Sequence, residues 1–462
     1  MNAVVSTAKL PMNNLSTQVL IVGYVWPEPR SSAAGAYMLQ LIELCLAQQW
    51  AVTFASPALP GEKRADLSAL GVVEQTITLN CSSFDSWVHA LQPTIVIFDR
   101  FMMEEQFGWR VAEQCPQALR VLASVDLHSL REARQQQLRE WLREDRSETG
   151  LLAPKLTPAD LFAHMAAQDL TQREIAAIFR SDLTLLVSDF EIELLTQHFQ
   201  VPPFLLAHCP LLPDPADTEA WPNFEERANF ISIGNFLHAP NWDAVLLLKE
   251  MLWPLIRARL SKEKSAKAQL FVYGAYAPQK AINLHNPAQG FNVMGWAADA
   301  LTVMRSARVC LAPLRFGAGI KGKLIDAMLC GTASVTTSIG AEGMSITDSA
   351  QANELIWNGA ITDTAQDFAD AAVQLHENIT LWQHAQQQGL RILQQRFNKA
   401  KLGATLIERL QQALEYREHN RRNNFIGAML QHHQHKSTQY MARWIEAKNA
   451  NDLPHSSHRQ AP

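Results

Sequence analysis

The sequence predicts an α/β protein with two doubly wound domains, each built on a parallel sheet with helices on both faces. Three observations predict this fold class. Short, continuous apolar segments alternate with longer amphipathic ones, as strands buried on both faces alternate with covering helices. A stretch rich in proline and acidic residues, Pro210 to Arg227, interrupts this alternation. The alternation then restarts at Asn229, which indicates a second sheet.

Each half of the chain contributes its own set of strands. In the first half we expect strands at 18–25, 51–56, 94–99, 120–126, 183–188 and 204–210, with helices at 35–50 and 190–200 between them. In the second half we expect strands at 229–235, 268–274, 291–295, 307–314, 333–338 and 354–359. A long helix from Asn241 to Leu260 follows the first strand of this second set. Residues 368–416 have a helical pattern, residues 419–450 form one or two basic amphipathic helices, and residues 451–462 are expected to be disordered.

These patterns divide the chain into four parts. We expect an acceptor-side domain at 1–215, a linker at 216–228, a nucleotide-sugar-binding domain at 229–395, and C-terminal helices with a tail at 396–462. Two doubly wound domains joined by a linker leave a cleft between them. Ligands of such sheets bind outside the carboxyl ends of the strands.

Composition limits the class of protein. Of the 462 residues, 47% are hydrophobic and 18% charged, which is typical of a globular chain with large cores. A net charge of -5 lacks the excess of basic residues seen in general nucleic-acid binders, so we expect no nucleic-acid partner. The six cysteines are scattered and form no C-x-x-C pair, which favours reduced thiols in the cytoplasm.

The sequence also bears on location. Its first residues lack the apolar core of a signal peptide, and no apolar run approaches the roughly 20 residues that span a bilayer. We therefore expect a cytoplasmic protein, and leave open contact with the inner face of a membrane.

The stretch "APLRFGAGIKGKLIDAML", from Ala312 to Leu329, carries the clearest functional signal. Its glycines permit close approach to the backbone, and Lys321 and Lys323 supply cations at the start of a helix. Because lysine there opposes the helix dipole, an anion is the natural compensation, and together these features describe a diphosphate site. The alternative is that both lysines are simply solvated. The Walker pattern is absent.

Other strand ends of the second half carry weaker signals. Gly234 and Asn235 follow one strand, and His238 precedes the long helix, whose free N–H groups suit an anion. Gly274 and Trp296 follow two further strands, where a flat ring could approach the backbone. Each of these features is also explained by an ordinary turn.

Asp326 lies one helical turn after Lys323 and so on the same face. Its carboxylate could accept both hydroxyls of a ribose, or it could pair with Lys323.

Taken together, "FISIGNFLHAPNWDAVLLLKEMLWPLI", "FVYGAY", "VMGWAADALTVMRSARVCLAPLRFGAGIKGKLIDAM" and "SIGAEGM" resemble the donor half of family 4 (group 1) retaining glycosyltransferases of the GT-B fold. The similarity covers Phe230 to Met344 and is strongest at "APLRFGAGIKGK". The first half resembles the acceptor half more loosely, through "QVLIVGYVWPEPRSSAAGAYMLQLI" and "RSDLTLLVSDFEIELLTQHFQV".

The resemblance implies a nucleotide-diphosphate sugar as donor. Lys321 and Lys323 would neutralise the diphosphate, and Asp326 falls where the family's second motif Glu holds the ribose. The donor-binding residues that it implies are Gly234, Asn235, His238, Gly274, Trp296, Arg315, Gly317, Gly319 and Asp326. One departure is that Ala318 stands at the first position of the Glu-x7-Glu motif, where the family's Glu contacts the donor sugar. The "GAGIK" loop resembles a sub-group that lacks this Glu.

In the first half, the resemblance places Gly35 in the loop that faces acceptor and diphosphate. Asp126 and His128 follow a strand where many members have a histidine near the donor sugar, although a lone strand-end histidine is often structural. Asp99 and Arg100 follow another strand and point either into the cleft or to solvent. We thus assign His128, Lys321 and Lys323 as catalytic, and Gly35, Asp99, Arg100 and Asp126 as acceptor-side.

The predicted activity is glycosyl transfer to a glycan, lipid-linked or protein acceptor. The resemblance implies retention of anomeric configuration, and no D-x-D motif or metal-ligand spacing occurs, so we expect neither metal nor other cofactor. The alternatives are a nucleotide-sugar hydrolase or epimerase on the same fold, and a binding or scaffold protein that has lost catalysis. A nicotinamide-dependent dehydrogenase is disfavoured, because no G-x-G-x-x-G follows the first strand.

The basic C-terminal stretch admits two interpretations. It combines cationic and large apolar residues: Arg417, Arg421, Arg422, Lys436, Phe425, Met429 and Trp444. These could lie on a membrane surface or a partner. Alternatively, the helix packs back on the first domain.

Overall fold

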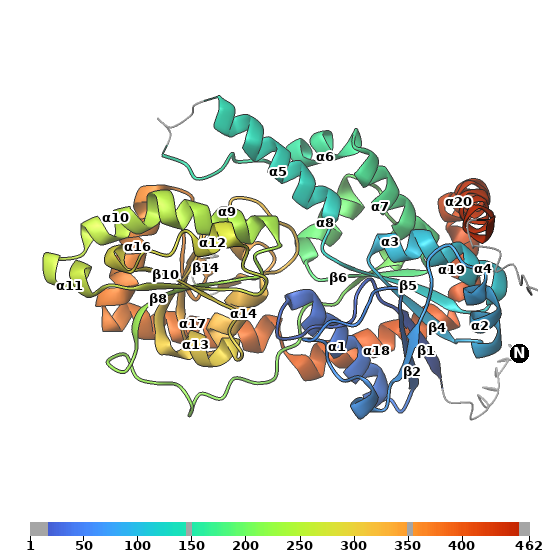
Figure 1. The fold of residues 1–462 in the computed structure, drawn as a ribbon, viewed down its shortest axis with the longest axis horizontal. Helices are drawn as coiled ribbons and strands as arrows, with labels where there is room; N and C mark the ends of the chain where they lie inside the picture. Colours follow the sequence, from blue (N-terminus) through green and yellow to red (C-terminus); the bar gives the residue numbers. More distant parts are fainter. Residues whose placement is uncertain (1–16, 145–149, 349–353, 452–462) are drawn as a thin grey trace, which may run out of the picture.

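The computed structural model describes residues 17–144, 150–348 and 354–451. Two α/β domains lie side by side (Figure 1), and the predicted fold class is confirmed. The disorder expected at 451–462 is wrong at Asn451, which ends a helix, and residues 452–462 lie outside the described residues.

The first domain is built on a parallel sheet in the order β3-β2-β1-β4-β5-β6-β7. Its strands are β1 (Gln18–Val22), β2 (Ala51–Ser56), β3 (Val73–Thr76), β4 (Ile95–Asp99), β5 (Leu119–Val125), β6 (Leu183–Leu186) and β7 (Leu206–His208). The inner strands are continuous apolar runs, such as "QVLIV" in β1, because helices cover both faces of the sheet. The edge strand β3, "VEQT", is half exposed and was not predicted.

Helices of the first domain connect these strands. They are α1 (Ala33–Ala47), α2 (Ser83–Leu91), α3 (Phe101–Met103), α4 (Trp109–Gln114), α5 (His128–Arg143), α6 (Pro158–Ala166), α7 (Asp169–Arg180) and α8 (Asp189–Gln197), with a π turn at Glu104–Gly108 between α3 and α4. The strand order reverses between β1 and β4, which is the switch point where doubly wound sheets bind ligands.

The second domain has the parallel order β10-β9-β8-β11-β12-β15. Its strands are β8 (Ala228–Ile233), β9 (Leu270–Tyr273), β10 (Phe291–Gly295), β11 (Ala307–Ala312), β12 (Ala333–Thr336) and β15 (Gly359–Ile361). The prediction of one sheet strand at 354–359 was wrong in detail. Residues Glu354–Ile356 form β14, which pairs antiparallel with β13 (Ile346–Asp348), and the sheet continues only at β15.

Helices of the second domain follow the predicted pattern. They are α9 (Ala239–Leu247), α10 (Trp253–Arg259), α11 (Lys262–Lys267), α12 (Gln279–Ile282), α13 (Ala300–Ser306), α14 (Gly322–Leu329), α15 (Ser338–Ala341), α16 (Ala365–Glu377) and α17 (Ile379–Arg396). The predicted long helix is α9 and α10 joined by a π turn at Leu248–Leu252. Here the order reverses between β8 and β11.

The linker and the last helices tie the two domains together. The buried Arg227 donates to Thr332 Oγ1 (2.8 Å) and to the carbonyl oxygen of Cys330 (2.6 Å), which anchors the linker to the second domain. After the second domain, α18 (Lys399–Glu415) returns to the first domain and lies beside α1 (Figure 1). It packs on α1, where a Cβ at Gly403 would lie 2.9 Å from Leu44. The predicted packing up to Tyr416 is thus observed, while the domain boundaries stay predictions.

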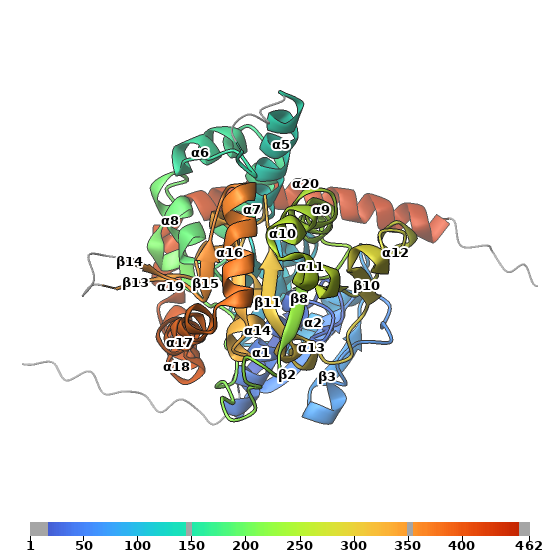
Figure 2. The ribbon, with the colours of Figure 1, turned by 90° about the vertical axis from the view of Figure 1, so that its left-hand side faces the viewer.

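The helices α19 (Arg417–Asn423) and α20 (Phe425–Asn451) continue along the first domain. Figure 2 shows α20 lengthwise across the end of the molecule. Within the described part of the chain, no helix combines the length and the apolar character that crossing a membrane requires.

Candidate active site

Residues 313–323 lead from β11 into the first turn of α14 at the switch point of the second domain, and we call them the glycine–lysine loop. Gly319 has a φ of +63°, a left-handed conformation that favours glycine. Lys321 Nζ donates to the carbonyl oxygen of Gly319 at 2.5 Å, and Lys323 Nζ donates to Asn241 Oδ1 at 2.7 Å. The loop therefore places two ammonium groups against its own backbone and the start of α9.

Both lysines are cations without a directly bound carboxylate. Within the described residues, neither ammonium group forms a salt bridge. Burial lowers the pKa of Lys321 and of Lys323 to about 8 in each case. Glu342, Glu191 and Asp126 act on Lys321 from longer range and partly oppose this shift. A bound anion would restore the positive charge that burial disfavours.

The β8 end lies directly beside this loop. Asn241 on α9 accepts from Lys323 and donates to the carbonyl oxygen of Asn235 at 3.0 Å. A Cβ at Gly234 would lie 2.6 Å from the Asn241 side chain, which explains the glycine. His238 caps α9 and is exposed. The structure thus brings the predicted phosphate-site residues of β8 and β11 together.

The ends of β9 and β10 are arranged differently from one another. A Cβ at Gly274 would lie 2.1 Å from the carbonyl oxygen of Gly234, so this glycine allows two strand ends to touch. Trp296 is half exposed and reaches the first domain, donating from Nε1 to the carbonyl oxygen of Arg30 at 3.2 Å. Lys63 Nζ, also from the first domain, lies 4.5 Å from the Trp296 ring centroid. Trp296, one of the predicted donor-binding residues, therefore lies where the two domains meet.

Two other predicted donor residues differ in their surroundings. Arg315 is engaged in a bidentate ion pair with Asp243 on α9, at 2.9 and 2.5 Å. Asp326 forms no salt bridge with Lys323, which bonds Asn241 instead, so the alternative pairing is not formed. Burial raises the pKa of Asp326 to about 7, against the opposing charge of Lys323.

On the first domain, the β4 end lies at the switch point. The buried Asp99 accepts from the backbone N–H of Tyr24 at 3.1 Å, and burial raises its pKa. Arg100 has a φ of +70° and places its guanidinium 5.1 Å from the Tyr24 ring centroid. A Cβ at Gly35 would lie 2.5 Å from the backbone of Glu28, so this glycine serves the packing of the β1–α1 loop.

The β5 end carries a charged cluster. Asp126 pairs with Arg131, and His128 Nε2 lies 3.5 Å from Asp126 Oδ1. Burial lowers the pKa of His128 to about 4, so the imidazole is neutral near pH 7. Burial would raise the pKa of Asp126, but Arg131 and His128 hold it below its usual value. The backbone N–H of His128 donates to Glu174 at 2.9 Å, which caps α5.

Sequence reasoning missed the contacts that join the two domains at this point. Glu191 on α8 is fully buried; its Oε1 accepts from the backbone N–H of Leu127 (3.1 Å) and from that of Gly319 (2.8 Å). Its Oε2 has no hydrogen-bond partner, and burial raises its pKa to about 8. No motif marks Glu191, because the contact depends on how the domains meet.

A second bridge lies beside the first. Arg134 on α5 forms a bidentate ion pair with Glu342 at 2.8 and 2.6 Å and donates to the carbonyl oxygen of Gly317 at 2.8 Å. Glu342 belongs to "SIGAEGM", which carried part of the resemblance, but nothing in the sequence assigned it a partner. In this conformation, then, the first domain holds the glycine–lysine loop at both Gly317 and Gly319.

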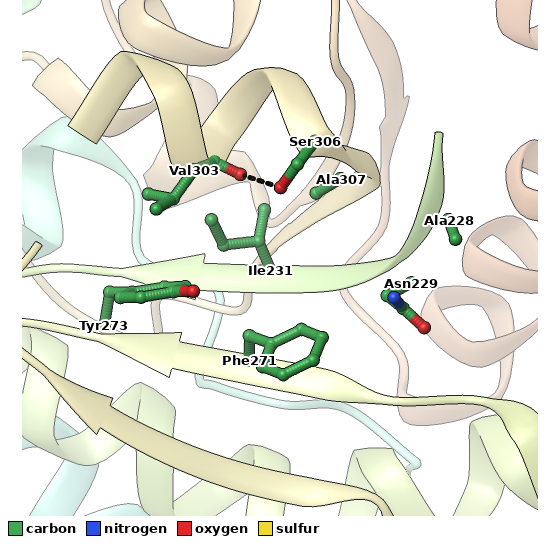
Figure 3. A pocket seen from close by; sticks show the side chains of 8 residues that line it. All are labelled: Ala228, Asn229, Ile231, Phe271, Tyr273, Val303, Ser306 and Ala307. Carbon is green, nitrogen blue, oxygen red and sulfur yellow. Dashed lines mark hydrogen bonds between the residues drawn. The ribbon is translucent and has the colours of Figure 1, made fainter. Parts of the chain in front are cut away.

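A small cavity lies elsewhere in the second domain, between α13 and the strands β8 and β9 (Figure 3). Mostly apolar side chains line it, and Ser306 Oγ donates to the carbonyl oxygen of Val303 at 2.8 Å. It contains none of the predicted site residues. Among the described residues, no group of three or more His, Cys, Asp or Glu side chains is placed to hold a metal ion.

Comparison with known proteins relates the second domain to one family. Residues 227–378 match the model of the family described as "Glycosyl transferases group 1". The matched residues include every strand of the second sheet, β8 to β15. This match confirms the predicted enzyme class, a glycosyltransferase. No curated protein gives a significant match to the chain.

Solved structures with the same fold include three glycosyltransferases or related enzymes. HepE of Anabaena, solved with UDP and glucose, has a TM-score of 0.58 and 12% identity over 86% of this chain and 100% of its own. A glycosyltransferase of Rickettsia africae has a TM-score of 0.57 and 10% identity, over 87% of this chain and 99% of its own. Sucrose-phosphate synthase of Thermosynechococcus elongatus has a TM-score of 0.57 and 14% identity, over 86% of this chain and 98% of its own. At these identities the likeness shows the GT-B fold alone.

Proposed function

We propose that this glycosyltransferase moves a sugar from a nucleotide-diphosphate donor to a glycan, lipid-linked or protein acceptor, with retention and without metal or other cofactor. The observation that supports it best is the pair Lys321 and Lys323, two largely buried cations without a salt bridge among the described residues, at the switch point of the group 1 domain. HepE, which shares the fold, was solved with UDP and glucose.

The lysines act on the leaving group. When the bond from the anomeric carbon to the diphosphate breaks, negative charge grows on the departing phosphate. Fixed cations and N–H groups stabilise that charge without having to reorganise. With a pKa of about 8, each lysine is mostly protonated near pH 7, and an arriving diphosphate favours the protonated form further.

The Gly319 N–H connects the diphosphate site to the first domain. In this conformation it binds the carboxylate of Glu191, at 2.8 Å. We expect the donor to replace this contact with a phosphate oxygen, because an anionic oxygen accepts from an N–H group more strongly than the Glu191 carboxyl, which a pKa of about 8 leaves mostly neutral near pH 7. Donor entry then requires the domains to separate at Glu191 and Arg134 and to close again on the bound donor. Closure excludes water, which limits hydrolysis of the donor.

The remaining roles follow from position. Asp326 lies one turn beyond Lys323 on α14 and binds the ribose. Ala318 packs in an apolar cluster where the resembling family has its sugar-contacting Glu, so the sugar is recognised by other groups. The first domain supplies these groups: neutral His128 lies on the donor-sugar side. Ionised Asp126 lies on the acceptor side, together with Asp99, Arg100 and Gly35.

Release of nucleoside diphosphate from a panel of UDP- and GDP-sugars, with and without candidate acceptors, tests the proposal. Transfer predicts release that depends on acceptor, a product of unchanged anomeric configuration by NMR, and activity that survives EDTA. Free sugar in the absence of acceptor indicates a hydrolase, and an isomerised donor an epimerase. If the protein binds no nucleotide, it is a scaffold protein that has lost catalysis, which Ala318 in place of the family's sugar-contacting Glu would explain.

A further inference from the structure

The outer face of α20 carries an unusual concentration of exposed apolar side chains. Phe425, Tyr440 and Trp444 are 74%, 64% and 61% exposed. The other exposed members of this face are Ile426, Met429 and Met441. Phe425, Met429, Tyr440 and Trp444 recur at helical spacing and so lie along one side of the helix. We call this set the α20 apolar face.

The orientation of α20 is fixed by contacts at both ends. Near its start, Gly427 packs against the carbonyl oxygen of Phe179, and Gln431 Nε2 donates to the carbonyl oxygen of Arg180 at 3.0 Å. Near its end, Ala442 is buried and Glu446 accepts from the N–H and hydroxyl of Ser82, at 2.8 and 2.6 Å. The α20 apolar face is therefore on the side turned away from the domain.

Cations accompany the apolar face. Lys436, Arg443 and Lys448 on α20 and Arg422 on α19 are exposed, and within the described part of the chain none of them forms a salt bridge. Lys448 Nζ lies 5.6 Å from the Trp444 ring centroid. The one acidic residue between Phe425 and Asn451, Glu446, is turned inward to Ser82. The surface is thus apolar, aromatic and positively charged, although the whole chain has a net charge of -5.

From this charge complementarity we infer that the α20 apolar face binds the surface of an anionic lipid bilayer. Aromatic rings with a polar edge are favourable at the headgroup level, and flanking Lys and Arg side chains are attracted to anionic headgroups. A second copy of the same face would oppose cation to cation, which disfavours self-association. The inference does not rest on glycosyl transfer, because it concerns the far end of the first domain.

The test is co-sedimentation of the full chain with vesicles of phosphatidylcholine alone or with about 30% phosphatidylglycerol added. We expect binding to the anionic vesicles, which weakens with salt, and little binding to phosphatidylcholine. The variant Phe425→Ser/Trp444→Ser should bind the anionic vesicles about tenfold more weakly, because it loses two exposed rings that the bilayer would bury. Its matched control, Leu59→Ser/Val73→Ser, changes two exposed apolar residues outside α20 and should bind as wild type.

A second variant tests the charges. Lys436→Glu/Arg443→Glu should lose the preference for anionic vesicles, whereas Lys262→Glu/Lys267→Glu on α11, with the same change in net charge, should keep it. Melting temperatures establish that each variant is folded. Failure of wild type to bind anionic vesicles, or equal binding by the α20 variants, overturns the inference. So does a wild-type dimer without vesicle binding that Phe425→Ser/Trp444→Ser converts to a monomer.

Discussion

Glu191 of the first domain accepts a hydrogen bond of 2.8 Å from the backbone N–H of Gly319 in the glycine–lysine loop of the second. This contact joins the first domain to the loop that we assign to the diphosphate. It is fully buried, and the other carboxylate oxygen of Glu191 has no hydrogen-bond partner. The state of this loop is thus coupled to how the two domains meet.

The protonation of Glu191 should make stability depend on pH. Its pKa is raised from 4.5 to about 8 in the folded chain, so the folded state binds more protons between these values. Its contribution is fully present below pH 4.5 and is lost as pH rises through 8. Glu191→Gln mimics the protonated form and removes this dependence. We expect the stability of wild type relative to Glu191→Gln to fall by on the order of 1 kcal/mol per pH unit across this window. Urea unfolding at about pH 5, 7 and 9 measures it, and a difference that does not change with pH contradicts the assignment.

A side chain at Gly319 should disturb both the loop and the domain contact. Alanine there would be strained at a φ of +63°, and its Cβ would lie 2.9 Å from Asp126 of the first domain. Gly71 provides the control, because it has a φ of +83° and a Cβ added there would meet no atom within 4 Å. We expect Gly319→Ala to lose at least about tenfold in kcat/KM, whereas Gly71→Ala loses only about 1 kcal/mol of stability from backbone strain. Equal activity of the two variants would argue against a role for the loop.

The ion pair between Arg134 and Glu342 should contribute to domain closure. Removing one partner leaves a largely buried charge, so Arg134→Gln or Glu342→Gln should each cost about 3–5 kcal/mol, and the double variant less than their sum. The exposed pair Lys267 and Glu263 is the control, whose removal should change stability far less, because solvent screens both charges. Urea unfolding of the single and double variants completes the cycle. Strictly additive losses would show that the pair is not coupled.

The lysines of the loop should matter for turnover more than for folding. Lys321→Ala/Lys323→Ala removes both cations that we assign to the leaving group, and we expect kcat with a nucleotide-sugar donor to fall by at least about 10²-fold. The melting temperature should change little by comparison. Lys262→Ala/Lys267→Ala on α11 removes the same charge far from the loop and should retain activity. Wild-type kinetics in the Lys321→Ala/Lys323→Ala variant would refute the phosphate assignment.

The fold was predictable where buried strands have a continuous apolar sequence. The inner strands are continuous apolar runs, and strands β2 and β10 have the predicted bounds, 51–56 and 291–295. The edge strand β3 was not predicted because none of its four residues is buried and its sequence is mostly polar. The single strand predicted at 354–359 corresponds to two strands, because β14 pairs with β13 and β15 pairs with β12. The local sequence does not show which strand each residue pairs with.

The site was predictable to the same extent. Glycines and lysines at strand ends indicated the loop, because a parallel sheet gathers its carboxyl ends at one edge. Contacts across domains were not predictable, since Glu191 and Gly319 are 128 residues apart and meet only when both domains are in place. Trp296 shows the same limit: its strand end was predicted, and its bond to Arg30 in the first domain was not.

Calorimetric titration of the full chain with UDP and with GDP near pH 7 tests the diphosphate site without requiring the sugar or the acceptor to be known. We predict that wild type and Lys262→Ala/Lys267→Ala bind at least one of the two nucleotides with the same affinity, and that Lys321→Ala/Lys323→Ala binds it at least about tenfold more weakly. Equal affinity in all three proteins, or no binding of either nucleotide to wild type, would contradict the assignment of this loop to a nucleotide diphosphate.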